Sequence, residues 1–429
     1  MIVAALLAVT LQSQAGDTAL LQYETAGVRV IHQPRRVSQI VSVQLYLLGG
    51  ASQLNAHNAG VEPLYLRASA YGTGSYPGEQ TRKALARTGS FIGVSAESDW
   101  TVYSFDGLAG RFDSTWSVFA DRLLKPTLDS ASVAVVRARM LSEVLRRRTS
   151  PEDEAWLLAD SLALRGHPYA HDPDGSVHSL PRLTPQVLRD YARDQFVTSR
   201  MLLVVVGDVS RSQVEAAVQR SFGGLPRGSY VWSLPPPLKP AATEIAVASR
   251  TTTTNYLVGV MAGPPRSSPD YPAFDRAQRL LGGWISYVVR ERATLSYAAG
   301  VAVYERGAPG AAIYVSTTRP DSAVRIINKI LSDYESVVTV PRPTLRAGAK
   351  SFTSAYVNAS ESSSGLASLL GRAALYDGDP TAASRKAEVM GKIAFHEMRS
   401  AIRTHARSVQ WAFVGDTTRV PRTDIMKRK

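Results

Sequence analysis

The chain contains no cysteine. Disulfides and thiolate chemistry are therefore excluded. It also lacks a run of about 18 consecutive apolar residues, the length that a helix needs to span a bilayer. The one notable apolar run, at residues 2–11, is much shorter. We therefore predict no transmembrane segment.

The same apolar run indicates export. Ser13, Gln14 and Ala15 follow it, with small residues at the two positions that a signal peptidase reads. We predict a signal peptide over residues 1–15 and a mature protein that is periplasmic or secreted.

Motifs for phosphate binding and for a serine nucleophile are absent. No Lys-Ser/Thr follows Gly49-Gly50 or Gly282-Gly283, and no Gly-x-Gly-x-x-Gly precedes a helix. The serine run at 362–364 has no Gly-x-Ser-x-Gly context. The run predicts the start of a helix or a loop rather than a catalytic site.

The composition indicates a folded protein with more than one domain. Its 429 residues are too many for one ordinary core, and 45% are hydrophobic while 20% are charged. The net charge of +13 comes mainly from scattered arginines, with denser groups at Arg146–Arg148 and Lys427–Lys429. Scattered charge is typical of a solvated surface, so we predict no nucleic-acid partner. An acidic partner or an anionic membrane surface stays open.

The sequence repeats itself once. Leu202–Asp208 is an apolar strand that ends in Gly-Asp, and Val409–Asp416 has the same pattern. Val41–Gly49 and Tyr256–Gly263 form a second pair of predicted strands. Further pairing links Thr88–Phe91 with Thr294–Tyr297, each followed by alternating residues. We predict two related α+β halves.

A proline-rich segment separates these halves. Residues 225–240 include Pro235–Pro237 and predict a stiff, extended linker. The predicted organisation is a signal peptide at 1–15, an N-terminal domain at 16–224, the linker at 225–240 and a C-terminal domain at 241–429.

Three neighbouring positions near residue 65 offer no metal ligand. Pro63, Leu66 and Arg67 are spaced i, i+3, i+4, so on a helix they share one face. Proline and leucine have no donor atom, and a protonated arginine repels a dication. Proline in a helix interior costs roughly 3 kcal/mol. We predict a helix that begins or bends near Pro63 and binds no metal.

The segment Gly60–Gly74 resembles the Gly-x-x-His-x-x-Glu-His stretch, followed by Gly-Thr, of the pitrilysin/insulinase metallopeptidases. These inverzincins include the mitochondrial processing peptidases. In that register Pro63 and Arg67 occupy the two zinc-histidine positions, and Leu66 occupies the position of the general-base glutamate. The resemblance implies two homologous halves, each a mixed β-sheet packed with helices, from Gln22 to about Asp416.

The same resemblance assigns a third ligand position. The family's ligand glutamate lies about 76 residues after the second histidine, and Arg67 plus 76 is Glu143. A lone carboxylate does not hold zinc. We expect Glu143, a possible remnant of the site, to pair with Arg139, Arg146 or Arg147 on its own helix, or with Arg67.

Arg290 and Tyr297 are the candidate substrate-binding residues. Their segment resembles the family's Leu-Arg-Glu-x-x-Gly-Leu-Ala-Tyr element, with Thr294 in place of the glycine. The resemblance implies that both side chains reach a bound peptide near the zinc. Arginine can donate to a peptide carbonyl, and a tyrosine hydroxyl can donate to a developing oxyanion. Alternatively, Arg290 lies on a solvated helix face and Tyr297 packs in a sheet.

A cluster of possible ligands lies between residues 167 and 178. Its members are His167, His171, Asp172, Asp174 and His178. Pro168, Pro173 and Gly175 predict a loop, in which i, i+4 spacing does not place two rings on one face. We interpret the cluster as the family's structural Gly-His-Pro loop.

The resemblance therefore implies a protein that is no enzyme by itself and needs no cofactor. As a heterodimer with a zinc-bearing pitrilysin-family subunit, it would contribute Arg290 and Tyr297 to a chamber that cleaves peptides. The alternative is a structural or peptide-capturing scaffold, analogous to core subunits of respiratory complexes. A third hypothesis is an enzyme with a new site.

Overall fold

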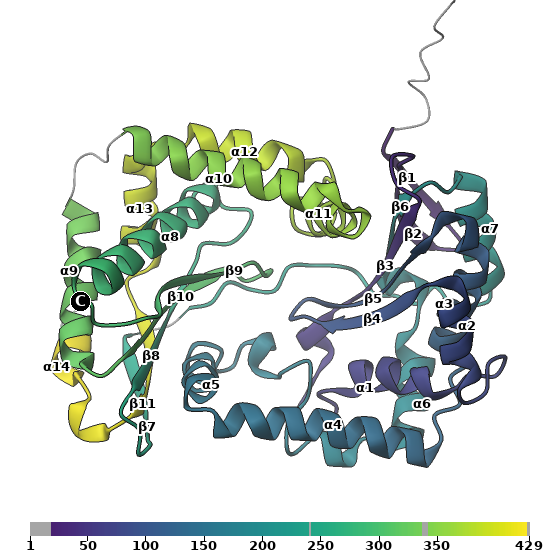
Figure 1. Cartoon of the computed structure of the whole chain (residues 1–429), viewed down its shortest axis with the longest axis horizontal. Helices are drawn as coiled ribbons and strands as arrows, with labels where there is room; N and C mark the ends of the chain where they lie inside the picture. Colours follow the sequence, from purple (N-terminus) through teal and green to yellow (C-terminus); the bar gives the residue numbers. More distant parts are fainter. Residues whose placement is uncertain (1–18, 240–241, 337–341, 427–429) are drawn as a thin grey trace, which may run out of the picture.

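The computed structural model describes residues 19–239, 242–336 and 342–426, which form two halves side by side (Figure 1). The predicted signal peptide at 1–15 lies outside the described residues, as do Pro240 and the basic residues Lys427–Lys429. Within the described ranges, no helix is long and apolar enough to cross a membrane.

The first half is built on a six-stranded sheet with the order β1-β2-β6-β3-β5-β4. Its strands are β1 (Leu21–Thr25), β2 (Val28–Pro34), β3 (Ile40–Leu48), β4 (Phe91–Ala96), β5 (Trp100–Leu108) and β6 (Met201–Gly207). β2 and β6 run parallel, whereas the other neighbours are antiparallel. The sheet is therefore mixed.

The second half repeats this arrangement with five strands in the order β7-β11-β8-β10-β9. They are β7 (Glu244–Ser249), β8 (Asn255–Ala262), β9 (Ala299–Tyr304), β10 (Gly310–Thr317) and β11 (Val409–Gly415). β7 and β11 form the parallel pair. β11 thus occupies the place of β6, and the predicted α+β fold with two homologous halves is confirmed.

The repeated Gly-Asp at the strand ends has a steric reason. Gly207 and Gly415 have φ angles of 154° and 152°. A Cβ atom on Gly207 would lie 2.6 Å from the Cα atom of Val41, and one on Gly415 would collide with the Asn255 amide. Both strand ends therefore require glycine.

Each sheet has one face covered by helices of its own half. The first half contains α1 (Val61–Ala68), α2 (Gln80–Thr88), α3 (Phe112–Leu124), α4 (Ser130–Thr149), α5 (Pro151–Ala163), α6 (Pro185–Gln195) and α7 (Arg211–Phe222). Residues of α1, α3, α4, α6 and α7 join strand residues such as Leu45 and Leu203 in one large apolar core.

The second half has a corresponding set of helices. They are α8 (Tyr271–Ser286), a π-helical turn (Tyr287–Arg292), α9 (Pro320–Ser336), α10 (Arg342–Glu361), α11 (Ser363–Tyr376), α12 (Ala382–Lys392), α13 (Phe395–His405) and α14 (Arg422–Met426). Residues of α8, α9 and α13 form the core of this half with β8, β10 and β11.

The opposite face of each sheet is covered by a helix from the other half (Figure 1). Ala155 and Ala159 of α5 pack against Val258 and Ala412 in the second sheet. In the same way α11 packs Ala367 and Leu370 against β3 and β6 of the first sheet. The two halves are therefore interlocked by an exchange of helices.

The proline-rich segment crosses between the halves without regular secondary structure from residue 226 to 239. Its Trp232 indole donates to the carbonyl of Leu375 at 3.0 Å, and Leu238 is buried. We propose residues 225–240 as the boundary between domains at 16–224 and 241–429.

Candidate functional site

The helix that resembles the zinc-binding helix is present as α1. Gly60 precedes it with a φ angle of 89°, and a Cβ atom there would lie 2.8 Å from the Leu180 side chain. Because α1 begins at Val61, Pro63 is its third residue, where the missing N–H has no intrahelical partner to lose. The prediction that the helix begins near Pro63 is confirmed.

A buried ion pair fixes α1 to the sheet. The Glu62 carboxylate lies 3.3 Å from the Arg200 guanidinium, with side-chain exposures of 4% and 2%. The Tyr191 hydroxyl also donates to Glu62 at 3.0 Å, and Arg200 donates to the Leu48 carbonyl at 2.8 Å. The polar contacts of Glu62 and Arg200 therefore hold α1 in place without a bound metal.

The three degenerate positions offer nothing to a zinc ion. Pro63 is buried, and Leu66 is fully buried in the apolar core. Arg67 is half-buried, and its guanidinium lies 2.8 Å from a carboxylate oxygen of Asp174. Across the part of the chain that the structure describes, no group of three or more His, Cys, Asp or Glu side chains could hold a metal. The donor set does not fit zinc.

Two arginine–aspartate pairs occupy this region instead. Besides the pair of Arg67 and Asp174, the guanidinium of Arg147 on α4 lies 3.0 Å from Asp172. Burial raises the pKa of Asp172, and Arg147 opposes that effect. Two helices thus hold one loop through ion pairs. Asp172 and Asp174 are possible ligands by their sequence alone, and the sequence does not show that each pairs with an arginine of a distant helix.

Glu143 is an ordinary surface residue. Its side chain is 56% exposed, and its two carboxylate oxygens accept from Arg146 at 2.6 and 3.2 Å. These hydrogen bonds lower the pKa of Glu143. Of the pairings expected from the sequence, the one with Arg146 is confirmed. The contact with Arg67 is wrong, because Asp174 takes that guanidinium.

The predicted Gly-His-Pro loop is also confirmed as a loop, with one short 3-10 turn at Pro168–Ala170. The His167 ring lies 2.8 Å from the carbonyl of Pro236 through Nε2 and accepts from the Tyr169 N–H through Nδ1. Burial lowers the pKa of His167. The ring therefore joins this loop to the linker.

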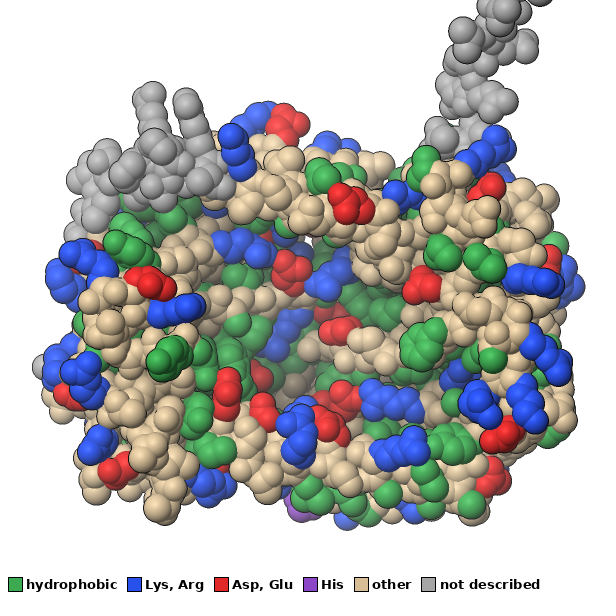
Figure 2. All heavy atoms as spheres, in the orientation of Figure 1, with side chains coloured by type: hydrophobic (Ala, Val, Ile, Leu, Met, Phe, Trp, Pro, Cys, Tyr) green, Lys and Arg blue, Asp and Glu red, His purple; other side chains and the backbone are tan. Residues whose placement is uncertain are grey.

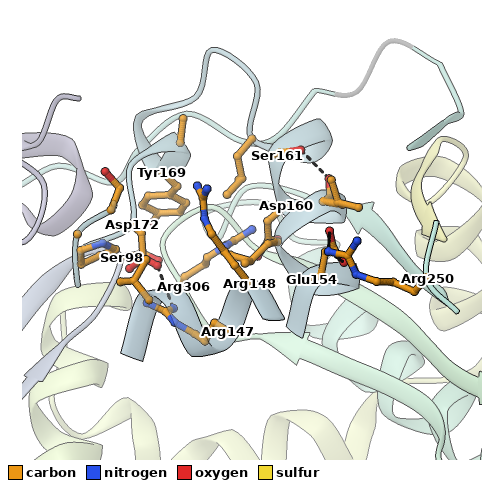
Figure 3. A pocket seen from close by; sticks show the side chains of 18 residues that line it. Ser98, Arg147, Arg148, Glu154, Asp160, Ser161, Tyr169, Asp172, Arg250 and Arg306 are labelled. Atoms are coloured by element: carbon orange, nitrogen blue, oxygen red, sulfur yellow. Dashed lines mark hydrogen bonds and ion pairs between the residues drawn. The ribbon is translucent and has the colours of Figure 1, made fainter. Parts of the chain in front are cut away.

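A cavity of about 880 Å³ lies between the two halves. Figure 2 shows this hollow, with acidic and basic side chains gathered around it. Its walls come from α4, α5, the loop at 169–176, Arg250 and Arg306 (Figure 3). Arg147 and Asp172 belong to these walls, so the cavity adjoins the loop held by α1.

The cavity carries charges of both signs. Arg250 pairs with Glu154 at 2.8 Å, and the Tyr304 hydroxyl lies 3.4 Å from Asp160. Burial raises the pKa of Asp160. Figure 3 shows Arg148 reaching into the cavity from α4. The lining offers donors and acceptors to a polar chain, and among the described residues it includes no histidine or cysteine.

The structure does not bring Arg290 and Tyr297 to this cavity. Arg290 lies in the π-helical turn, 3.3 Å from Glu291, and Tyr297 is 95% exposed in the loop before β9. The alternative that Tyr297 packs in a sheet is therefore wrong. Thr294 has a φ angle of 51°, a left-handed conformation that explains why the family uses glycine there. A role of the pair in peptide binding stays a prediction.

An outer strand lies beside α1. β4 is the last strand of the first sheet, and α1 packs against it. A second cavity of about 770 Å³ next to β4 is lined by Tyr71, Leu85 and Phe91, and Phe91 is 74% exposed. An outer strand presents backbone N–H and C=O groups that can pair with another chain.

Comparisons with known proteins agree with this geometry. Residues 29–170 match the profile of the Insulinase (Peptidase family M16) family, and residues 182–342 match that of the Peptidase M16 inactive domain. Cytochrome b-c1 complex subunit 1 of Bos taurus is 22% identical over 214 residues, covering 49% of this chain and 44% of the relative. The probable mitochondrial-processing peptidase subunit beta of Schizosaccharomyces pombe is 22% identical over 275 residues, covering 62% and 60%. The chain spans less than two thirds of either relative.

Solved structures share the whole fold. The peptidase M16 inactive domain from Pseudomonas fluorescens superposes with a TM-score of 0.83 at 22% identity, over 93% of this chain and 98% of that one. The periplasmic protease PqqL from Escherichia coli has a TM-score of 0.75 at 13% identity, over 96% and 48%. With both halves matched and the ligand positions of α1 lost, the chain belongs to the insulinase (M16) metallopeptidase family as a member without the His-x-x-Glu-His motif.

Proposed function

We propose that this chain is a non-catalytic subunit that pairs with a zinc-bearing M16 homologue and contributes peptide binding to a shared proteolytic chamber. The observation that carries the proposal is α1, which is folded in place while Pro63 and Arg67 occupy its two zinc-histidine positions and Leu66 occupies its general-base position. A chain of this fold without a metal can contribute to proteolysis only through a partner. The relative from Schizosaccharomyces pombe is named as a subunit of a processing peptidase, and this name supports a function together with another chain.

Purification from the native cell envelope tests the pairing. We expect this chain to co-purify with an exported homologue that carries an intact His-x-x-Glu-His motif, and peptide hydrolysis to require both chains. A stable monomer without such a partner would contradict the proposal. It would favour the alternative, a structural or peptide-capturing scaffold.

Outer strand β4 supports the peptide-binding part of the proposal. An extended peptide could add to β4 as a further strand, with apolar side chains in the neighbouring cavity at Phe91. We expect an unstructured peptide to bind the purified chain, and the same peptide with methylated backbone nitrogens to bind at least tenfold more weakly. Equal affinity for both peptides would exclude strand addition.

The scaffold alternative has its own support. Tyr297 is 95% exposed, and neither Tyr297 nor Arg290 lines the cavity between the halves. The similarity to cytochrome b-c1 complex subunit 1 also fits a subunit with a structural role. A reconstituted heterodimer separates the two functions, because a scaffold would raise the stability of its partner without changing the partner's turnover.

We further propose that the protein is exported through a signal peptide at residues 1–15, a segment outside the described residues. The fold similarity to a protein named as a periplasmic protease supports an extracytoplasmic location. N-terminal sequencing of the protein from the cell envelope should give Gly16 as the first residue. An intact Met1 in a cytoplasmic fraction would contradict this.

A further inference from the structure

Asp99 is a buried carboxylate that joins the two halves. It lies in the turn between β4 and β5 and is 4% exposed. It accepts hydrogen bonds from the Tyr169 hydroxyl, from the Tyr376 hydroxyl at 2.6 Å and from the Gly307 N–H at 2.8 Å. Three donors from three distant segments therefore meet at one side chain.

The fold explains why these donors converge. Tyr169 follows α5, whereas Tyr376 is the last residue of α11, so each tyrosine lies near the end of an exchanged helix. Gly307 lies in the turn between β9 and β10, which meets the turn that carries Asp99. One carboxylate thus connects the tips of both sheets to the ends of both exchanged helices.

The two phenols are suited to remain donors. Burial, and then the charge of Asp99, raises the pKa of both Tyr169 and Tyr376. An arginine lies over each ring: Arg306 is 5.1 Å from the centroid of Tyr169, and Arg266 is 3.6 Å from that of Tyr376. The arginines oppose this rise in pKa, but burial and Asp99 outweigh them, so each phenol stays protonated and donates to Asp99.

The junction contributes residues to two cavities. Tyr169 and Arg306 line the cavity between the halves. Tyr376 and Arg266 line a different cavity of about 270 Å³ among α8, α10, α11 and α12. Asp99 therefore holds one wall residue of each cavity through a single carboxylate.

We propose that Asp99 is a latch that fixes the angle between the two halves and thereby the width of the cavity between them. When this acceptor is lost, the buried Tyr169 hydroxyl and the buried Gly307 N–H lose their acceptor, and the partly buried Tyr376 hydroxyl keeps only the Glu305 carbonyl at 3.3 Å. The halves then open at the junction, while the cores of both sheets, which do not involve Asp99, keep their packing.

The absence of cysteine makes the test direct. Lys83 on α2 and Lys329 on α9 are exposed and belong to opposite halves, so Lys83→Cys and Lys329→Cys introduce the only two thiols for spin labels. Pulsed electron–electron double resonance on the full chain, without partner or peptide, should give one narrow distance distribution. Asp99→Ala should broaden it or add a second distance.

Matched variants isolate the latch. Asp106 is an exposed carboxylate on β5, and Asp106→Asn should leave the distribution narrow. Tyr169→Phe with Tyr376→Phe keeps the rings and removes both donors, so this double variant should reproduce the broadening if Asp99→Ala does not fold. An unchanged distribution in a folded Asp99→Ala, or in the double variant, overturns the proposal, as does equal broadening in Asp106→Asn. Because no peptide or partner is used, the result is independent of the proposed function.

Discussion

Arg67 on α1 lies 2.8 Å from Asp174, so a position that carries a zinc ligand in the motif that α1 resembles has become one half of an ion pair. The pair of Arg147 and Asp172 lies on the same loop. Two guanidinium groups therefore supply positive charge to this region, and the carboxylates of Asp172 and Asp174 on the loop form ion pairs with them. These two ion pairs keep the loop attached to α1 and α4 without a metal.

This relationship predicts the effect of breaking the pair. Arg67→Ala should lower the free energy of unfolding by about 1 kcal/mol, a modest amount because both side chains are about one-third exposed. The charge-reversed double variant, Arg67→Asp with Asp174→Arg, should be more stable than the summed losses of its two single variants, Arg67→Asp and Asp174→Arg, would give. Urea denaturation of the four proteins of this double-mutant cycle measures the coupling. A coupling energy of zero would mean that the pair does not hold the loop.

Local patterns in the sequence predicted much of the fold. The strand at Leu202–Asp208 and its repeat at Val409–Asp416 were readable because apolar runs and a terminal Gly-Asp depend on neighbouring residues. The loss of the zinc site was equally readable, because the resemblance assigns its two histidines and its glutamate to Pro63, Arg67 and Leu66, which lie within one short segment.

The long-range partners could not be predicted in this way. Arg67 and Asp174 are 107 positions apart, and Asp99 and Gly307 are 208 apart. These contacts depend on where turns place the chain after both sheets have formed. The exchange of α5 and α11 was hidden for the same reason, since an amphipathic helix does not show which sheet it covers.

The purified chain should bind no stoichiometric zinc and cleave no unstructured peptide. Leu66 is fully buried, and Arg67 is committed to Asp174, so no ligand set remains on α1. Metal analysis after dialysis against zinc, together with a fluorogenic peptide screen, measures both properties. Cleavage that a chelator abolishes, and that persists through rigorous purification, would show that a metal site exists elsewhere.

Arg290 and Tyr297 should matter only in the assembled heterodimer. Arg290→Ala and Tyr297→Phe should each lower turnover by roughly 10²–10³, the usual effect of removing one donor to a developing oxyanion. Assembly and the partner's zinc should be unchanged, because both side chains are exposed. Arg292→Ala and Glu143→Gln are matched surface controls that should retain wild-type turnover. If the Arg290 and Tyr297 variants also match wild type, the pair has no role in proteolysis.

His32 should make the fold sensitive to acid. It is fully buried on β2, and burial lowers the pKa of its imidazole in the folded state. The unfolded chain, in which a histidine has a pKa of about 6.5, therefore binds more protons than the folded chain between these two pKa values. Stability is full above the unfolded pKa and falls as the pH drops below it, by at most about 1.4 kcal/mol per pH unit from this one group.

A variant without the buried imidazole isolates this contribution. Between pH 7.5 and pH 5, the free energy of unfolding of His32→Leu should fall by less than that of wild type. The reason is that leucine cannot bind the proton that His32 takes up in the unfolded state. This comparison holds whatever the stability of the variant at neutral pH. Urea denaturation at several pH values gives the slope for each protein. His178 is exposed, so His178→Asn should keep the wild-type slope. An unchanged slope in His32→Leu would show that other groups, not this histidine, cause the acid sensitivity.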